Sequence, residues 1–503
     1  MVRRIENYSE LWKQADWKQF CKVLFRLQHR VWKAVRTGDM AKARNIQKLI
    51  LKSHSARMLA IRQVTQLNLG KKTAGVDGKA KLTFKARFEL ESLLKKSAFM
   101  WKHKKLREIP IPKKDGTTRM LKVPTIADRA WQCLVKYALE PAHEAQFHAR
   151  SYGFRTGRSA HDAQKFLFLN LRSSCNGKDK RVLELDLEKC FDRISHKAII
   201  ERVIAPQFIK QGLWLCLKAG TNPQFPEQGT PQGGVCSPLL ANIALNGIED
   251  LGKSVRYADD MVFILKPNED AGKLLEKIET FLAERGMKIS ERKTKLTATT
   301  DGFDFLGWHF KVQSNGKFKI TPSEENFKAF QQKVKKVVNS SNYGATEKAD
   351  KLAPIVRGWR NYHRYCDLSS SRDSLWFMNN RAFKVFNKEK KQTKYSAEAL
   401  VRRAFPKVGY KESKFIPVKG EKSPYDGDVI YWSQRNSRLY NGLTAKALKE
   451  QNHSCGRCKL KFIPGERIHL HHCDGNHGNW NKNNLLAIHE SCHDYLHMGK
   501  SKS

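Results

Sequence analysis

The chain has 503 residues, 40% of them hydrophobic, and its 94 Lys and Arg exceed its 49 Asp and Glu to give a formal net charge of +45. This length exceeds one compact core, so we expect two to four domains. Positive charge spread along the whole chain favours a polyanionic partner such as nucleic acid over a merely soluble basic protein. No stretch is long and apolar enough to cross a membrane, and the polar first residues lack the apolar core of a signal peptide.

Residues 1–70 are predicted to form a basic helical N-terminal extension, because apolar residues recur there at helical spacing with Lys and Arg between them. The basic face either binds RNA or is the solvated side of core-packing helices. Residues 106–121 have the pattern of two strands around an Asp-Gly turn. Lys113 and Arg119 flank this turn, so the hairpin presents both cations either to a phosphate group or to water.

Two loops have compositions typical of ligand contact. Ser151–Ser159 combines aromatic, basic and glycine residues, which suits contact with a phosphate backbone and stacking, or else a surface loop with one packed ring. Gln228–Asn242 is rich in glycine and runs into an apolar helix. Its glycines allow close approach of a ligand, but it lacks the Gly-Lys-Ser/Thr ending of a P-loop.

Acidic residues occur at two positions where their charge is costly. Asp186 falls within an apolar strand, where it needs a cation such as a metal ion, unless Glu184 and Asp186 both face water. Asp259 and Asp260 fall at the turn of a predicted hairpin, which is either an ordinary acidic turn or a Mg²⁺ site. If the two elements are neighbours, they complete a site for two ions about 3.5–4 Å apart.

Seven of the 11 cysteines are scattered singly, whereas four cluster near the C-terminus with many histidines. This distribution indicates a reducing compartment and a metal-binding module rather than a disulfide framework. Four residues occur as two closely spaced pairs, which predicts a structural zinc site: Cys455 and Cys458, then His489 and Cys492. His493 and His497 are four residues apart, so they face the same side of a helix.

The order of motifs resembles a reverse transcriptase of the group II intron-encoded (maturase) family over nearly the whole chain. The palm motifs are similar to Asp186 with Phe191, Pro231-Gln232-Gly233, Tyr257-Ala258-Asp259-Asp260, Gly286–Thr294 with Lys293, and Phe305-Leu306-Gly307. The fingers motifs of this family are similar to Ile111–Arg119 and Ser151–Ser159. The characteristic motif of its thumb domain, often called domain X, is similar to Val356–His363.

The resemblance implies a role for each matching residue. Asp186 and Asp259 would bind two Mg²⁺ ions, and Asp260 would assist them. The expected nucleotide-binding residues are Lys113 and Arg119 at the triphosphate, Phe191 under the sugar, Gln232, and Lys293. In-line attack of a primer 3′-hydroxyl on a phosphate needs positioning and charge neutralisation more than a protein nucleophile, which agrees with this set. We expect the rings of Trp359 and Tyr362 in the thumb to pack rather than to bind RNA.

The C-terminal residues resemble an HNH endonuclease. That resemblance implies that His472 is the general base, that Asn484 orients the strand pair, and that a divalent ion is bound by His471, His493 and His497. The alternative is one or two structural zinc sites without cleavage. Cys473 stands where the family usually has an aliphatic residue, and it is a candidate spare ligand.

The resemblance implies an α+β multidomain fold with right-hand polymerase fingers and palm, a helical thumb and a small zinc-dependent ββα-metal nuclease domain. The expected division is 1–70 basic helical extension, 71–320 fingers and palm, 321–400 thumb, 401–450 DNA-binding segment and 451–503 HNH endonuclease. The DNA-binding segment is basic, has no diagnostic pattern, and carries the rings of Tyr410, Phe415, Tyr425, Tyr431 and Trp432.

We therefore expect an RNA-directed DNA polymerase that binds intron RNA, assists splicing, nicks target DNA and copies the intron into DNA for intron mobility. The expected partners are intron RNA, target DNA and dNTP substrates, with no membrane, in the cytoplasm of a bacterium or in an organelle. The expected cofactors are Mg²⁺ in the polymerase, structural Zn²⁺ and a divalent ion in the HNH site. The alternatives are an RNA-binding splicing cofactor with idle polymerase and nuclease sites, or a reverse transcriptase recruited to defence.

Overall fold

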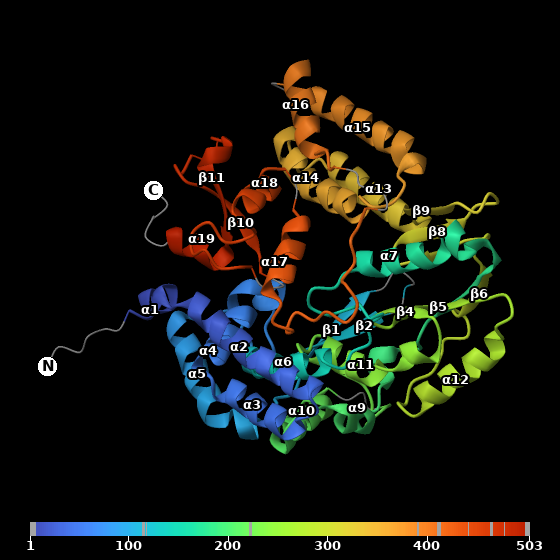
Figure 1. Ribbon diagram of the computed structural model, residues 1–503. Helices are drawn as coiled ribbons and strands as arrows, with labels where there is room; N and C mark the ends of the chain where they lie inside the picture. Colours follow the sequence, from blue (N-terminus) through green and yellow to red (C-terminus); the bar gives the residue numbers. More distant parts are fainter. Residues whose placement is uncertain are drawn as a thin grey trace.

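The computed structural model describes residues 7–112, 116, 118–220, 224–389, 392–409, 414–440, 442–462, 466–476 and 478–497 (Figure 1). Two residues named from the sequence lie outside these residues: Lys113, which is predicted to bind nucleotide, and Tyr410 of the predicted DNA-binding segment. Within them, no helix combines the length and the apolar character needed to cross a membrane.

The N-terminal region is helical, as predicted. Its helices are α1 (Tyr8–Gln14), α2 (Trp17–Arg36), α3 (Met40–Lys52), α4 (His54–Arg62) and α5 (Phe84–Ser97). Helices α2, α3 and α4 pack against α6 (Ile126–Glu144), α5 packs against α4, and α1 packs against α5. Side chains of Asp16 and Asp39 cap α2 and α3 by accepting hydrogen bonds from backbone N–H groups. The apolar positions of α2, such as Val31 and Val35, are buried, so its Lys and Arg lie on the solvated face.

A four-stranded antiparallel sheet forms the palm, in the order β4-β5-β3-β6. Its strands are β3 (Arg181–Leu185), β4 (Ser254–Tyr257), β5 (Asp260–Leu265) and β6 (Lys295–Ala298). The surrounding helices are α7 (Ala160–Leu171), α8 (Cys190–Arg193), α9 (His196–Arg202), α10 (Gln207–Ala219), α11 (Ser237–Leu245) and α12 (Ala271–Ala283). On β3 and β5, odd-numbered residues such as Leu183 and Phe263 pack with the N-terminal helices and α11, whereas Val182 and Val262 pack with α7, so both faces are covered.

Two smaller sheets lie beside the palm. The predicted fingers hairpin is confirmed as β1 (Arg107–Pro112) paired with β2 (Thr118–Val123), and Ile111 lies opposite Arg119. A three-stranded sheet continues the apolar core that α7 covers. Its strands are β7 (Phe303–Phe305), β8 (Trp308–Val312) and β9 (Phe318–Pro322).

The thumb is a bundle with its own core, at the top of Figure 1. It consists of α13 (Glu324–Val338), α14 (Ala345–Tyr362), α15 (Arg372–Asn387) and α16 (Lys394–Ala404). Trp359 stacks on Phe330 with 4.5 Å between ring centroids, and Tyr362 stacks on Trp308 at 4.4 Å. The prediction that these two rings pack is therefore confirmed, and the second stack joins the thumb to β8.

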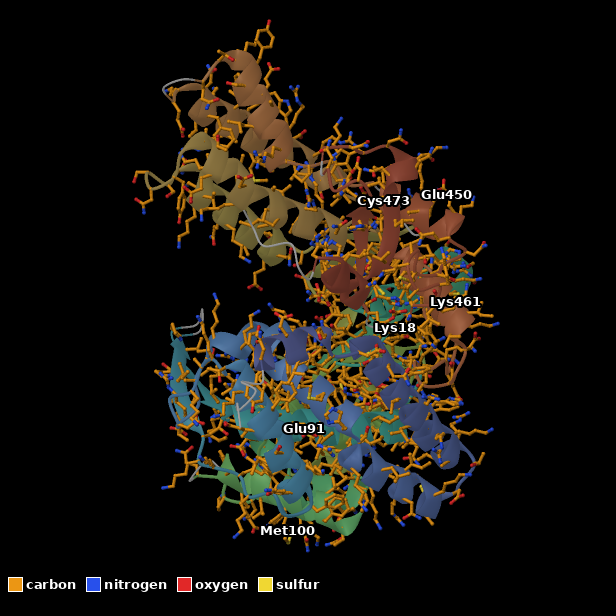
Figure 2. The ribbon with its side chains drawn as sticks, turned by 90° about the vertical axis from the view of Figure 1, so that its left-hand side faces the viewer. Lys18, Glu91, Met100, Glu450, Lys461 and Cys473 are labelled. Carbon is orange, nitrogen blue, oxygen red and sulfur yellow. The ribbon has the colours of Figure 1, made fainter. Side chains whose placement is uncertain are left out.

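The C-terminal residues form a small module beside the N-terminal helices (Figures 1 and 2). It comprises α17 (Val429–Arg438), α18 (Gly442–Glu450), β10 (Ile468–His472), β11 (Leu485–His489) and α19 (Glu490–Leu496). β10 and β11 form an antiparallel pair against which α19 packs, in a ββα arrangement. Arg62 on α4 lies 3.1 Å from the carboxylate of Asp494 on α19, which ties the module to the N-terminal region.

Candidate functional site

Two acidic residues lie at the tip of the β4–β5 hairpin. Tyr257 pairs with Asp260 across the hairpin, so Ala258 and Asp259 form the turn. Ala258 has a φ of 60°, in the left-handed region that a tight two-residue turn uses. The predicted hairpin is confirmed, with Asp259 in its turn and Asp260 as the first residue of β5.

Asp186 follows directly on β3, in the middle of the palm sheet. Leu185, the last residue of β3, pairs with Met261 of β5, which places Asp186 beside the start of β5 where Asp260 lies. The ammonium nitrogen of Lys293 lies 3.0 Å from an Asp186 carboxylate oxygen. The sheet register therefore brings Asp186 to the two hairpin acids, as the sequence predicts, with Lys293 beside them.

The charged forms of Asp259 and Asp260 are disfavoured at this site. Burial raises the pKa of Asp259, and the nearby charge of Asp186 raises it further. Desolvation and the charges of Asp259 and Asp186 raise the pKa of Asp260 to about 6. Carboxylate oxygens are the hard ligands that Mg²⁺ prefers, and a divalent cation offsets their mutual repulsion. The residues present therefore fit magnesium.

The raised pKa of Asp260 predicts how stability depends on pH in the metal-free protein. An aspartate of an unfolded chain has a pKa of about 3.9, whereas the pKa of folded Asp260 is about 6, so the folded state binds this proton more tightly. The resulting stabilisation is present below the unfolded pKa and is lost as the pH rises through about 6. We expect the melting temperature of the wild type, measured in a chelator, to fall across this window relative to Asp260→Asn. Parallel pH profiles of the two proteins would contradict the prediction.

The fingers hairpin contacts the Gly-rich loop next to the acids. Arg119 Nε donates a hydrogen bond to the side-chain oxygen of Gln232, and the Gln232 amide donates to Asp192 Oδ1 at 3.2 Å. Phe191 immediately precedes Asp192 on α8 and is half-buried. The structure thus brings together three of the predicted nucleotide-binding residues, Arg119, Gln232 and Phe191, on the palm side of the fingers.

Arg256, which directly precedes the hairpin motif, was not predicted from the sequence to have a role at this site. Arg256 is fully buried, and its Nε lies 2.6 Å from the equally buried carboxylate of Glu249. Its other nitrogens donate to Asn242 Oδ1 at 2.8 Å, Ser151 Oγ at 2.8 Å and the Ala258 carbonyl at 3.0 Å. Burial alone would raise the pKa of Glu249, but the Arg256 charge holds that pKa below its usual value. Arg256 therefore anchors the turn that carries Asp259.

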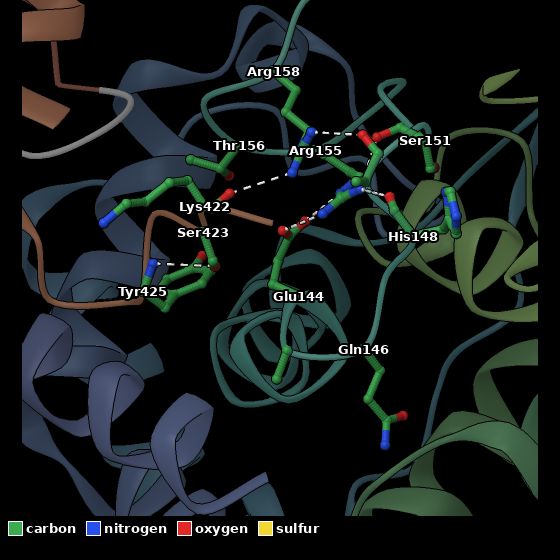
Figure 3. A network of polar contacts seen from close by, with 12 residues as sticks. Glu144, Gln146, His148, Ser151, Arg155, Thr156, Arg158, Lys422, Ser423 and Tyr425 are labelled. Atoms are coloured by element: carbon green, nitrogen blue, oxygen red, sulfur yellow. Dashed lines mark hydrogen bonds and ion pairs between the residues drawn. The ribbon is translucent and has the colours of Figure 1, made fainter. Parts of the chain in front are cut away.

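The arginines of the Ser151–Ser159 loop bind other parts of the chain, whereas the composition of the loop left open either contact with a phosphate backbone or a surface loop with one packed ring. Figure 3 shows Arg155 directed at Glu144, to which it donates two hydrogen bonds of 2.8 Å. A third Arg155 nitrogen donates to the Ser151 carbonyl at 2.7 Å. Arg158 donates to the Lys422 carbonyl at 3.3 Å, so it holds the segment that leads to α17. Both guanidinium groups bind the chain itself.

The predicted zinc ligands converge in the C-terminal module. The ligand atoms of Cys455, Cys458, His489 and Cys492 all lie within 4.8 Å of one another. His489 Nδ1 lies 3.4 Å from Cys458 Sγ and 3.8 Å from Cys492 Sγ, while its Nε2 lies 3.2 Å from the Glu466 carboxylate. A carboxylate behind a ligating histidine fixes the ring and its tautomer. Three thiols and one imidazole in a closed group fit structural zinc.

A second cluster lies on the same module. The ligand nitrogens of His471, His493 and His497 also lie within 4.8 Å of one another. The Nε2 of His497 is buried and has no hydrogen-bond partner among the described residues, which fits a metal ligand. His472 is 6% exposed, and its ring contacts Trp480 edge-on at 4.9 Å. Three imidazoles with an adjacent histidine fit a borderline divalent ion that keeps an open coordination position.

Asn484 closes the loop between β10 and β11. Its amide donates to Asp474 Oδ1 and to the Asn479 carbonyl, both at 2.9 Å, and its oxygen accepts from the Asp474 N–H. These contacts fix the loop, and an orienting role of Asn484 at a nuclease site stays a prediction. Cys473 is exposed and belongs to neither ligand cluster of the described residues, so it is not a spare ligand.

The rings of the predicted DNA-binding segment, residues 401–450, are mostly packed. Phe415, Tyr425 and Trp432 are buried, and the Trp432 indole donates to the Ser423 carbonyl at 2.8 Å. Arg435 on α17 pairs with the buried carboxylate of Asp162 at 2.9 Å. These three rings pack within the protein, and the Phe415 ring contacts that of His161 on α7. DNA binding by this segment stays a prediction, which now rests on its exposed Lys and Arg residues alone.

Comparison with known proteins agrees with the motif order. Residues 12–94 match the N-terminal domain of reverse transcriptase, residues 111–310 match the reverse transcriptase (RNA-dependent DNA polymerase) family, and residues 327–405 match the maturase-specific domain of group II introns. Maturase-like protein 1 of Euglena gracilis is 41% identical, over 77% of this chain and 85% of that protein. The group II intron-encoded protein LtrA of Lactococcus lactis is 25% identical, over 50% of this chain and 56% of that protein.

The palm acids, the fingers contact and these matches define the class of protein, a reverse transcriptase. The match to the maturase domain and the extent of the similarity to the Euglena protein define the family. The chain belongs to the group II intron reverse transcriptase/maturase family. Its reverse transcriptase domain supports RNA-directed DNA polymerase activity, for which this family of domains uses Mg²⁺.

Proposed function

We propose that this protein binds its intron RNA, assists splicing, nicks one strand of target DNA and copies the intron RNA from the new 3′ end. The observation that carries the polymerase part is the convergence of Asp186, Asp259 and Asp260 in the palm sheet. The ββα module with its two ligand clusters supports the nicking part. The net charge of +45 suits a protein that holds a long RNA.

Each of the predicted residues of the palm and fingers has a separate role in nucleotide addition. Asp186 and Asp259 would hold Mg²⁺, which stabilises the attacking and leaving oxygens of an in-line displacement. Arg119 would donate hydrogen bonds to the triphosphate of the incoming nucleotide, and these would replace its present hydrogen bond to Gln232. Phe191 lies beneath the sugar position and excludes a ribose 2′-hydroxyl by its bulk. Lys293 holds Asp186 in place by its 3.0 Å contact until substrate binds.

The polymerase proposal is tested by incubating the purified chain with a DNA primer on an RNA template, Mg²⁺ and dNTPs. We expect complementary DNA, and none when a chelator removes the metal. If no product forms even after group II intron RNA is added, the protein is a splicing cofactor with an idle polymerase site, and the proposal is wrong.

The nuclease proposal assigns His472 the role of general base for attack of water on a DNA phosphate. His472→Ala is expected to slow nicking of a DNA duplex by about 10²–10⁴-fold, the usual contribution of general-base catalysis. Zinc content and primer extension should not change, because His472 is in neither ligand cluster. Cys473→Ala, at the exposed neighbouring position, is the matched control and should nick normally. Equal nicking by His472→Ala and the wild type would leave the module with a structural role alone.

A further inference from the structure

Phe154 has an unusual environment for a large apolar residue. Its side chain is 51% exposed, although its neighbours Tyr152, Gly153 and Arg155 are buried. Its backbone has a φ of 58°, a left-handed conformation that residues other than glycine and asparagine rarely adopt. An exposed ring on a strained backbone persists only where surrounding contacts impose it, and such positions cluster at functional sites.

The loop that carries Phe154 is fixed to the catalytic hairpin. A Cβ on Gly153 would lie 2.2 Å from the backbone nitrogen of Ala258, so the two backbones are in direct contact. Tyr152 N–H donates to the Arg256 carbonyl at 2.9 Å, and Asn242 donates to the Gly153 carbonyl at 2.8 Å. These contacts hold Phe154 at a constant position relative to the turn that carries Asp259.

The other side of the loop is held equally firmly. Arg155 binds Glu144 through two hydrogen bonds, and its remaining nitrogen binds two backbone carbonyls, including that of Ser151 (Figure 3). Phe154 thus stands between two anchored residues, Gly153 and Arg155. Because the loop is anchored on both sides, the backbone that carries the Phe154 ring is fixed in place.

The Phe154 ring contacts Phe191 edge-to-face. The ring centroids are 6.4 Å apart and the planes make an angle of 79°, a geometry that aromatic pairs favour. The backbone of Phe191 is held separately, because its carbonyl accepts a hydrogen bond of 2.6 Å from the Thr230 N–H. The side chain of Phe191, which is only half-buried, receives a lateral contact from Phe154.

We propose that Phe154 is a positioning residue that holds the Phe191 ring in the orientation that discriminates deoxyribonucleotides from ribonucleotides. The inference rests on the proposed function, in which Phe191 lies beneath the sugar of the incoming nucleotide. Exclusion of a 2′-hydroxyl by bulk requires that the blocking ring does not turn aside. The contact with Phe154 prevents the Phe191 ring from rotating away, and the anchored loop keeps Phe154 in position for this contact.

The test compares kcat/KM for one dNTP and the matching rNTP in single-nucleotide extension on an RNA template. Phe154→Ala removes the ring, and we expect the preference for dNTP to fall by about 2- to 10-fold, the range of an aromatic pair worth about 0.5–1.5 kcal/mol. Phe154→Asn should lose the same preference, and it is the safer variant for folding because asparagine tolerates the left-handed conformation. Phe154→Tyr keeps the edge contact and should retain the wild-type preference.

The double variant separates positioning from a general structural role. In a Phe191→Ala background, Phe154→Ala should change the dNTP preference no further, because the two residues act as one unit. Unchanged preference in both Phe154→Ala and Phe154→Asn would overturn the inference, and so would an equal loss of dNTP and rNTP incorporation. Absence of dNTP incorporation by the wild type would instead overturn the proposed polymerase function.

Discussion

Replacing Arg256 with methionine is expected to destabilise the folded protein by about 3–5 kcal/mol, the cost of removing one partner from a buried ion pair. Glu249 would keep a fully buried carboxylate without its cation. The Ala258 carbonyl and Asn242 Oδ1 would each lose a donor. Because Ala258 adjoins Asp259, we also expect nucleotide incorporation by the folded fraction to slow by about 10²-fold, since small displacements of catalytic groups have effects of this size.

A second buried ion pair, far from the palm hairpin in sequence, provides a control that separates the loss of stability from the loss of catalytic rate. Arg57 donates to Glu91 at 2.8 Å in the N-terminal helices, and its side chain is 4% exposed. Arg57→Met should also lose stability, but less than Arg256→Met because Glu91 keeps its 3.0 Å contact with His54, and its folded fraction should keep a normal rate of incorporation. Denaturant unfolding gives the stabilities, and single-turnover extension at a temperature where both variants are folded gives the rates. A normal rate in folded Arg256→Met would show that the Arg256 contact with Ala258 does not position the catalytic turn.

Local patterns were enough to predict the elements that carry the polymerase site. The Asp-Gly turn between alternating residues predicts the β1–β2 hairpin, and the acids before an apolar run predict the β4–β5 hairpin. The proximity of Asp186 to Asp260 followed from treating both segments as strands of one sheet. The cluster of Cys455, Cys458, His489 and Cys492 was predictable for a similar reason, because the two members of each pair are separated by a single turn of chain.

The role of each buried cation could not be predicted from the sequence, because it depends on residues far along the chain. Arg256 donates to Ser151, 105 residues away, and Arg435 pairs with Asp162, 273 residues away. A surface arginine and a buried one look alike in sequence, so the composition of the Ser151–Ser159 loop could not show that Arg155 and Arg158 bind the chain itself. The sequence held one indication for Arg256, which is its place between Val255 and Tyr257 in an apolar strand. Burying a charged side chain there costs free energy unless it has a partner, and the same reasoning identified Asp186.

Substituting Asp259 with asparagine is expected to slow nucleotide incorporation on the order of 10³-fold, because several kcal/mol of charge stabilisation depend on the metal that this carboxylate would hold. The fold should tolerate the change. Burial and the charge of Asp186 raise the pKa of Asp259, so its ionised form is disfavoured in the metal-free protein. Removing that charge relieves repulsion on Asp260, and stability should stay equal or rise. Loss of activity would then report chemistry rather than unfolding.

The most direct measurement is single-turnover extension of a DNA primer on an RNA template in Mg²⁺ by the wild type, Asp259→Asn and the control Asp301→Asn. Asp301 is an exposed aspartate in the turn before β7, away from the hairpin motif. We expect rapid extension by the wild type and Asp301→Asn, and almost none by Asp259→Asn at equal amounts of bound primer–template. Equal extension by all three proteins would place the polymerase chemistry elsewhere and contradict the assignment of the palm hairpin as the catalytic site.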